Sequence, residues 1–241
     1  MNRTHYVYWL RGEAFVDLAR LSIESIRKVD SAPAIHVWTD EPTSTPRIGD
    51  TAWHVLESGR PAMVANLDAQ IAALNYLQPG DPVLFLDADV LLQRPFCWSL
   101  VPDLYVTWRS HVNHDEALAD FCRSQPYNYG VVGCHVRPQV IEAFYWLRAR
   151  ILQMNARNQA WHGNQLALAE LVGSPPKEGQ ADRDVRVRWS PLDRGTTLTV
   201  RQLPCDTWNY SPDGVEDVSA RAILHLKGDR KDLMAHYAEG A

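Results

Sequence analysis

Two aspartates one residue apart, Asp87 and Asp89, have the residue types and spacing best suited to chemistry in this sequence. They follow the apolar run 83–86 and precede Val90, within the segment PVLFLDADVLLQRP at residues 82–95. A continuous apolar run predicts a strand buried on both faces, and open α/β sheets bind ligands beyond the carboxyl ends of their strands. Alternation sends both carboxylates to the same side of the chain. Two adjacent hard oxygen ligands predict a Mg²⁺ or Mn²⁺ site completed by substrate phosphate oxygens.

The elements that must position these acids alternate along the chain. The pattern predicts strands at residues 5–10, 34–39, 53–56, 104–108, 127–135, 185–189, 198–203 and 222–226, and helices at 13–29, 61–77, 136–157 and 161–172. A short helix is expected from Lys231, and Gly130 predicts a close backbone approach within its strand. This order indicates an α/β fold with a doubly wound, mostly parallel central sheet flanked by helices.

Composition limits the class of protein. The 241 residues are 46% apolar and 22% charged, which predicts one globular α/β domain over residues 1–241. A net charge of −5 argues against a broad nucleic-acid surface. The four cysteines show no C-x-x-C spacing, so the sequence suggests neither a zinc site nor a disulfide framework. No stretch is long enough to cross a membrane, and the apolar run near the first residue is too short for a signal peptide. We therefore expect a cytoplasmic location.

Five motifs in a fixed order carry a family resemblance. FLDADV resembles the Asp-x-Asp motif of GT-A-fold glycosyltransferases, and PYNYGVVG resembles the Asn-x-Gly strand of the family 8-like retaining enzymes. GNQLAL, LPCDTWNY and ILHLKGDRK are similar to the Asp-Gln helix start, the Trp-Asn-Tyr segment and the closing His-x-x-Gly-x-x-Lys of that family. The resemblance implies a GT-A (Rossmann-like) fold and metal-dependent transfer of a sugar from a nucleotide diphosphate sugar to a hydroxyl acceptor, with retention of configuration.

The resemblance also implies ligands for the metal and the donor. Asp87, Asp89 and His225 would bind Mn²⁺ or Mg²⁺ together with the diphosphate of UDP-glucose or UDP-galactose. The backbone at Gly228 would approach the diphosphate, and Lys231 would neutralise its charge as it leaves. Tyr8 and Asp40, near the ends of the first two strands, would hold the base and ribose of the donor. Ala88 would lie beside the ribose.

A further set would face the sugar and the acceptor. The resemblance gives catalytic positions to Gln165 and Asn128 alongside Lys231, and a sugar-side wall to Asn164, Trp208 and Asn209. The sequence departs from the family at Asn164, where an Asp is usual. It also lacks the usual basic residue in the helix before the central strand, where Met63, Asn66 and Gln70 are the candidates. The sequence shows no strong base at these positions. The resemblance implies that the departing phosphate itself deprotonates the acceptor.

Other functions remain open from the residues alone. LFLDADVLL also fits a haloacid dehalogenase-like phosphatase, with Asp87 as nucleophile and Asp89 as general acid, although that motif normally opens a chain. A non-catalytic nucleotide-sugar binder is the third possibility. The acceptor could be a glycan, a lipid-linked sugar, a protein or hydroxymethylated DNA. The cationic residues Arg183, Arg186, Arg188, Arg194 and Arg201 could follow DNA phosphates or alternate along an exposed strand. His111, His114, Asp115 and Glu116 could form a second metal site or a solvated surface.

Overall fold

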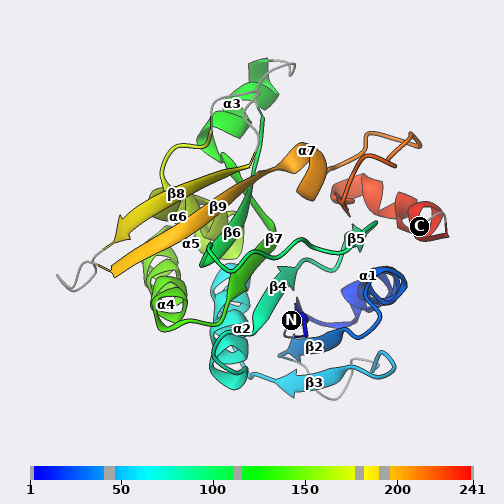
Figure 1. Ribbon diagram of the computed structural model, residues 1–241, viewed down its shortest axis with the longest axis horizontal. Coiled ribbons are helices and arrows are strands. Elements are labelled where there is room, and N and C mark those ends of the chain that lie inside the picture. The colour runs from blue at the N-terminus through cyan, green and yellow to red at the C-terminus, as the bar shows by residue number, and fades with distance from the viewer. Residues whose placement is uncertain (1–2, 41–46, 111–115, 177–181, 190–195, 240–241) are drawn as a thin grey trace.

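The computed structural model describes residues 3–40, 47–110, 116–176, 182–189 and 196–239, and its core is an eight-stranded sheet (Figure 1). The strand order is β3-β2-β1-β4-β7-β6-β9-β8. The bounds are β1 His5–Leu10, β2 Ala34–Thr39, β3 Ala52–Val55, β4 Pro82–Leu86, β6 Leu104–Trp108, β7 Tyr127–His135, β8 Arg183–Trp189 and β9 Thr196–Pro204. Strands β7 and β8 run against the others, so the sheet is mostly parallel, as predicted.

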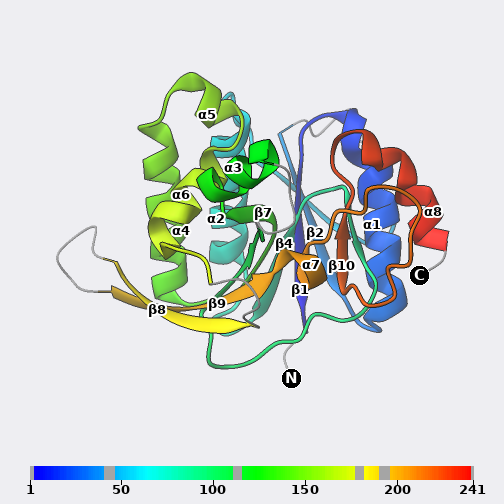
Figure 2. The ribbon, with the colours of Figure 1, turned by 90° about the horizontal axis from the view of Figure 1, so that it is seen from above.

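Helices cover both faces of this sheet (Figure 2). On one face lie α2 (Ala62–Tyr76), α4 (Pro138–Leu152), α5 (Ala156–Ala160) and α6 (Gly163–Val172), and α3 (Glu116–Ser124) lies at the top of Figure 1. On the other face lie α1 (Val16–Val29), which follows the short turn η1 (Glu13–Phe15), and α8 (Met234–Glu239). Within β4, Val83 and Phe85 join the core under α2 and α4, whereas Leu84 and Leu86 join the core under α1. This alternation explains why β4 is apolar throughout.

The chain beyond the two aspartates forms a second, two-stranded sheet. Strand β5 (Val90–Leu92) pairs antiparallel with β10 (Ile223–His225), and His225 lies opposite Val90. The turn η2 (Gly228–Leu233) and α8 follow, and Met234 and Tyr237 pack on Leu91 and Leu224. The small sheet therefore joins the segment after the acids to the carboxyl-terminal segment.

One predicted helix is interrupted. The pattern at 136–157 predicted a continuous helix, but α4 ends at Leu152 and α5 begins after Asn155. The Asn155 side chain accepts a hydrogen bond from the Asn158 backbone N–H at 2.9 Å, which caps the new helix. None of the helices in the described part of the chain is both long and apolar enough to cross a membrane.

Candidate active site

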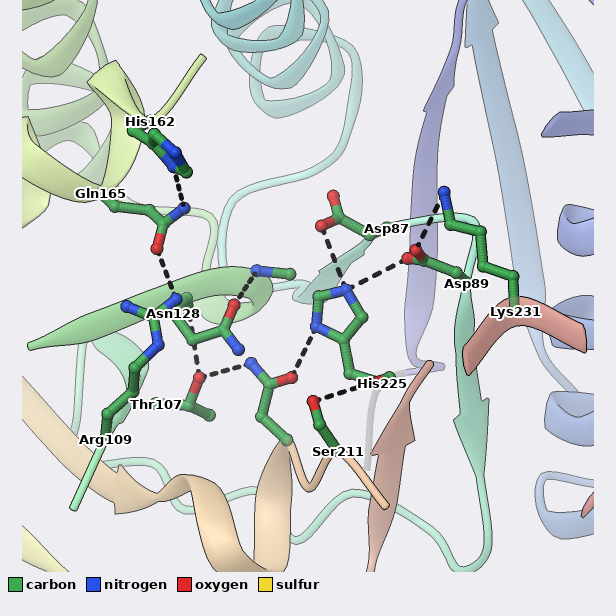
Figure 3. A network of polar contacts seen from close by, with 12 residues as sticks. Asp87, Asp89, Thr107, Arg109, Asn128, His162, Gln165, Ser211, His225 and Lys231 are labelled. Atoms are coloured by element: carbon green, nitrogen blue, oxygen red, sulfur yellow. Dashed lines mark hydrogen bonds and ion pairs between the residues drawn. The ribbon is translucent and has the colours of Figure 1, made fainter. Parts of the chain in front are cut away.

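Three predicted metal ligands meet at the carboxyl end of β4. His225 Nε2 lies 3.1 Å from Asp89 Oδ1 and 3.5 Å from Asp87 Oδ2 (Figure 3). Ligand atoms of the three residues lie within 4.8 Å of one another, and His225 is 4% exposed. Both carboxylates come from the segment between β4 and β5, and the imidazole comes from the last residue of β10.

A glycine makes room for the histidine. A Cβ atom at Gly130 would lie 2.1 Å from His225 Cε1 and 2.9 Å from Asp87 Oδ2. Gly130 lies on β7 beside β4, and its carbonyl accepts a hydrogen bond from the Asp87 backbone N–H at 3.0 Å. The close backbone approach predicted at Gly130 is thus present, and its partner is the His225 ring.

The ring of His225 has a defined tautomer within this network. Asn209 Nδ2 donates to Thr107 Oγ1 at 2.7 Å, so Asn209 Oδ1 is left to accept a hydrogen bond from His225 Nδ1 at 2.8 Å. In the neutral ring Nδ1 then carries the proton, and the lone pair of Nε2 points at two carboxylates. The three groups are then all electron-pair donors, and this donor set fits Mn²⁺ or Mg²⁺.

The charges around the two acids differ. The surrounding protein raises the pKa of Asp87, although 46% of its side chain is exposed to the cavity, and the Asp89 charge adds to the rise. Burial acts on Asp89 in the same direction, but protonated His225, which donates from Nε2, and the Lys231 ammonium outweigh it and lower the pKa of Asp89. Lys231 Nζ lies 3.5 Å from Asp89 Oδ2. Asp89 is therefore the better stabilised anion of the pair.

A cavity of about 300 Å³ opens beside the acids. Asp87, Ala88, Asp89 and Lys231 line it together with residues of β1, α2 and β7, among them Met63, Asn66 and Gln70. Lys231 Nζ also lies 5.0 Å from the centre of the Phe15 ring, a cation–π contact that fixes its direction. Gly228 has a φ of 58°, a left-handed conformation that favours glycine and turns the chain from β10 into η2.

Tyr8 does not line this cavity, which corrects its predicted position. Alternation along β1 places Val7 and Trp9 on the cavity side and Tyr8 on the α1 side, where it is fully buried. Its hydroxyl lies 2.7 Å from Ser22 Oγ. Asp40, at the end of β2, lies beside Arg11 with an Nε–Oδ2 distance of 3.3 Å. The other oxygen of Asp40 is buried with no hydrogen-bond partner among the described residues.

Two of the predicted sugar-side residues, Asn128 and Gln165, lie opposite the metal ligands, at the left of Figure 3. Asn128 is buried and its Oδ1 accepts from the Gly130 N–H at 3.2 Å. Asn164 is buried and its Oδ1 accepts from the Gln165 N–H. Gln165 Oε1 accepts from Arg109 at 2.5 Å, and Gln165 Nε2 lies 3.5 Å from His162 Nδ1. All three amides are therefore held by hydrogen bonds within the protein.

Trp208 and Asn209 support the site from behind. Trp208 packs edge-on against Phe96 at 5.2 Å and does not line the cavity. Asn209 is buried and fixes His225, as described above. The predicted wall of Trp208 and Asn209 against the sugar is thus corrected, because both side chains point into packed protein.

Two cations near the site were missed by sequence reasoning. Arg109 follows β6 and donates to the carbonyls of Gln125 and Tyr127 as well as to Gln165. Lys227 follows β10, and burial, followed by the Arg109 charge, lowers the pKa of Lys227 to about 8. Single charged residues carry no spacing signal, so no sequence pattern identifies them; the register that brings them together is long-range.

The other predicted cationic and metal-ligating residues lie elsewhere. Arg183, Arg186 and Arg188 are exposed on the edge strand β8, which fits alternation along a solvated strand. Arg201 forms an ion pair with Asp184 at 2.7 Å. Arg194 and the possible metal ligands His111, His114 and Asp115 lie outside the described residues, and Glu116 is exposed at the start of α3.

Comparison with known proteins identifies the fold. No protein-family model matches the sequence, and a search of curated proteins finds no significant match. Among solved structures, the chain is similar to a crystal structure of the galactosyltransferase LgtC in complex with donor and acceptor sugar analogues. The TM-score is 0.57, with 12% identity over 98% of this chain and 95% of that chain. The expected GT-A fold is therefore confirmed, over nearly the whole length of both chains.

Proposed function

We propose that this protein transfers a sugar from a UDP-sugar, UDP-glucose or UDP-galactose, to a hydroxyl acceptor, with retention of configuration and dependence on Mn²⁺ or Mg²⁺. The observation that carries the proposal is the convergence of Asp87, Asp89 and the His225 lone pair beside a cavity that also contains Lys231. The same fold in a galactosyltransferase crystallised with donor and acceptor sugar analogues supports a sugar nucleotide as donor.

The residues have separate parts in this reaction. The bond between the sugar and the diphosphate breaks, the acceptor oxygen bonds to the same sugar carbon, the acceptor proton leaves, and UDP is released. A bound metal ion would offset the negative charge of the diphosphate. Lys231 adds a positive charge that acts most strongly as the leaving group gains charge. Asp40, with its unpartnered buried oxygen, remains a candidate contact for the ribose or base.

Retention is supported by the shortage of free acids. Among the described residues that line the cavity, the carboxylates are Asp87 and Asp89, and both belong to the metal site. An inverting transfer needs a separate base to take the acceptor proton. Here the departing diphosphate is left to take that proton, which keeps the acceptor on the side of the sugar that the leaving group occupied.

The deciding experiment measures UDP release and sugar transfer with a panel of nucleotide sugars and Mn²⁺. We expect turnover that EDTA abolishes and Mn²⁺ restores better than Ca²⁺. Hydrolysis of a phosphomonoester such as p-nitrophenyl phosphate without nucleotide-sugar turnover would support the phosphatase alternative. Calorimetric binding of UDP and Mn²⁺ without any turnover would indicate a binding protein.

A further inference from the structure

A buried pair of hydrogen-bonding side chains lines the cavity beside the acids. Gln70 of α2 and Tyr129 of β7 are 5% and 3% exposed, and both line the cavity. The Tyr129 hydroxyl donates to Gln70 Oε1 at 2.8 Å. This bond occupies the carbonyl oxygen of the amide, and Gln70 Nε2 has no hydrogen-bond partner among the described residues. The two N–H groups of Nε2 are therefore available to a ligand in the cavity.

The order of the strands places this pair on the sugar side of the metal site. Strand β4 lies between β1 and β7 in the sheet, and the two acids follow β4. Asp40, the candidate contact for the base or ribose, lies at the end of β2, beyond β1. Tyr129 lies on the opposite side of β4, next to Asn128 in β7. A nucleotide sugar with its diphosphate at the acids and its base toward β2 would therefore extend its sugar toward Tyr129 and Gln70.

The wall of the cavity around this pair offers no counter-charge to an acidic sugar. The residues of α2 that line it are all uncharged, namely Ala62, Met63, Asn66, Ala69 and Gln70. The cations among the described lining residues are Arg11 and Lys231, and each already lies beside an acid. Asp87, which also lines the cavity, would repel a second carboxylate. The wall therefore suits hydroxyl groups better than a carboxylate.

We propose, on the basis of the function proposed above, that Gln70 determines donor specificity by donating from Nε2 to a hydroxyl group of a neutral hexose. A UDP-sugar that carries a carboxylate binds less tightly. Tyr129 is a positioning residue, because its hydroxyl holds Oε1 and so turns the N–H groups toward the sugar. A buried donor of this kind favours a sugar that accepts its hydrogen bond, since without that sugar the polar group is left unpaired.

The first test measures the affinities of UDP, UDP-glucose and UDP-galactose by calorimetry in the presence of Mn²⁺. Gln70→Met should weaken the tighter UDP-hexose by about 3–10-fold, since one hydrogen bond is lost, and leave UDP within about two-fold of the parent. Asn75→Leu is the matched control on the same helix, because the Asn75 amide donates to the Ile71 carbonyl and does not line the cavity. It should keep both affinities. Equal UDP-hexose binding by Gln70→Met and the parent would overturn the inference.

The positioning role of Tyr129 has its own readout. Tyr129→Phe should weaken the UDP-hexose in the same direction as Gln70→Met and leave UDP unaffected. Adding Tyr129→Phe to Gln70→Met should cause no further loss, because Tyr129 acts through the amide that is already absent. A further loss of UDP-hexose affinity in the double variant, or none in Tyr129→Phe alone, would contradict the positioning role.

Deoxygenated donors distinguish a contact with the sugar from a general disturbance of the cavity. A series of UDP-hexoses that each lack one hydroxyl group is compared in the parent and in Gln70→Met. One member should bind both proteins within about two-fold, because its missing hydroxyl is the partner of Gln70. A uniform loss of affinity across the series in Gln70→Met would overturn the inference.

An acidic donor tests the charge preference in the parent alone, should Gln70→Met not fold. UDP-glucuronate should bind the parent about 10-fold or more weakly than UDP-glucose, because its carboxylate meets no free cation. Gln70→Arg supplies a positive charge and should reduce that difference. Equal binding of the two donors by the parent, or a difference that Gln70→Arg leaves unchanged, would overturn the inference. Absence of UDP binding in every variant would instead count against the proposed function.

Discussion

Histidines occur in two contrasting settings in this molecule. His225 points its Nε2 lone pair at two carboxylates beside the cavity. At the other end of the sheet, His5, His36 and His54 form a ladder across β1, β2 and β3, with nitrogen–nitrogen distances of 3.0 and 3.2 Å. The ladder ends at Asp81, whose Oδ2 lies 3.4 Å from His5 Nε2.

The two settings differ in the partners of the ring nitrogens. If His5 donates to Asp81, then His36 donates to His5 and His54 donates to His36, so three neutral rings satisfy one another. Burial, followed by the neighbouring His5 and His54, lowers the pKa of His36 to about 4. In contrast, Asn209 contacts only Nδ1 of His225, so that Nε2 faces Asp89 at 3.1 Å and Asp87 at 3.5 Å. A histidine cluster therefore does not make a metal site unless carboxylates converge on a free nitrogen.

The largest expected effect separates the two settings by activity. Asp89→Asn should lower kcat by about 10³-fold or more, because it removes a metal ligand worth several kcal/mol of charge stabilisation. His36→Asn, the matched change in the ladder, should leave kcat within about two-fold of the parent. Steady-state UDP release at saturating Mn²⁺ measures both. A similar fall in kcat in the two variants would contradict the assignment of Asp89 to the active site and of His36 to a structural ladder.

A second prediction tests whether Lys231 takes part in the reaction at the donor side of the site. Lys231→Ala should lower kcat by roughly 10²–10³-fold, since its charge matters most as the diphosphate leaves. UDP affinity, measured by calorimetry, should fall much less. A kcat within about two-fold of the parent would remove Lys231 from the proposed chemistry.

A smaller effect is expected from the glycine behind His225. Gly130→Ala must displace the imidazole, because the new methyl group would lie 2.1 Å from His225 Cε1. We expect Mn²⁺ affinity to fall by about 10–100-fold, as when the support of a metal ligand is lost. Gly133→Ala on the same strand meets its nearest neighbours at 3.3 Å and is the control. Unchanged Mn²⁺ binding in Gly130→Ala would show that His225 is not a ligand.

The ladder predicts an acid-sensitive stability of about 2 kcal/mol. The folded-state pKa of His36 lies below its ordinary value of 6.5, so the unfolded chain binds more protons between these values. This part of the stability is complete above pH 6.5 and is lost as the pH falls toward about 4. Urea unfolding should show about 2 kcal/mol less stability at pH 5 than at pH 7.5. In His36→Asn the difference should shrink, and an undiminished difference would place the acid sensitivity elsewhere.

The sequence predicted the strands well where a continuous apolar run marks each of them. Strands at 5–10, 34–39, 104–108 and 127–135 coincide with β1, β2, β6 and β7. Apolar runs identify such strands because burial and hydrogen bonding favour the same segments. Which face Tyr8 would occupy was not predictable, because both faces of β1 are buried. The same limit applies to Trp208, an aromatic residue that suits a core as well as a sugar.

The spatial arrangement of the site depends on strand pairing between distant segments, which the sequence pattern did not predict. The acids and the closing His-x-x-Gly-x-x-Lys segment were recognisable as motifs, but their distance in space depends on the β5–β10 register. Arg109 and Lys227 had no motif, because a single charged residue carries no spacing signal. Asn209 was recognisable as a site residue, but its partner, the His225 ring, was not.

The two-stranded sheet of β5 and β10 also sets when the site can appear during folding. The large sheet draws on strands up to β9, whereas His225 and Lys231 arrive only when β10 docks on β5. Contacts between segments so distant in the chain repay their loop-closure cost only once they form, so we expect them to form late. We expect an early native-like intermediate that has its main core but binds no Mn²⁺. Pulsed hydrogen exchange at Leu91 and Leu224, read beside the Mn²⁺ response, would time that step. We therefore expect the main sheet to assemble first and the metal site to form in a later step of folding.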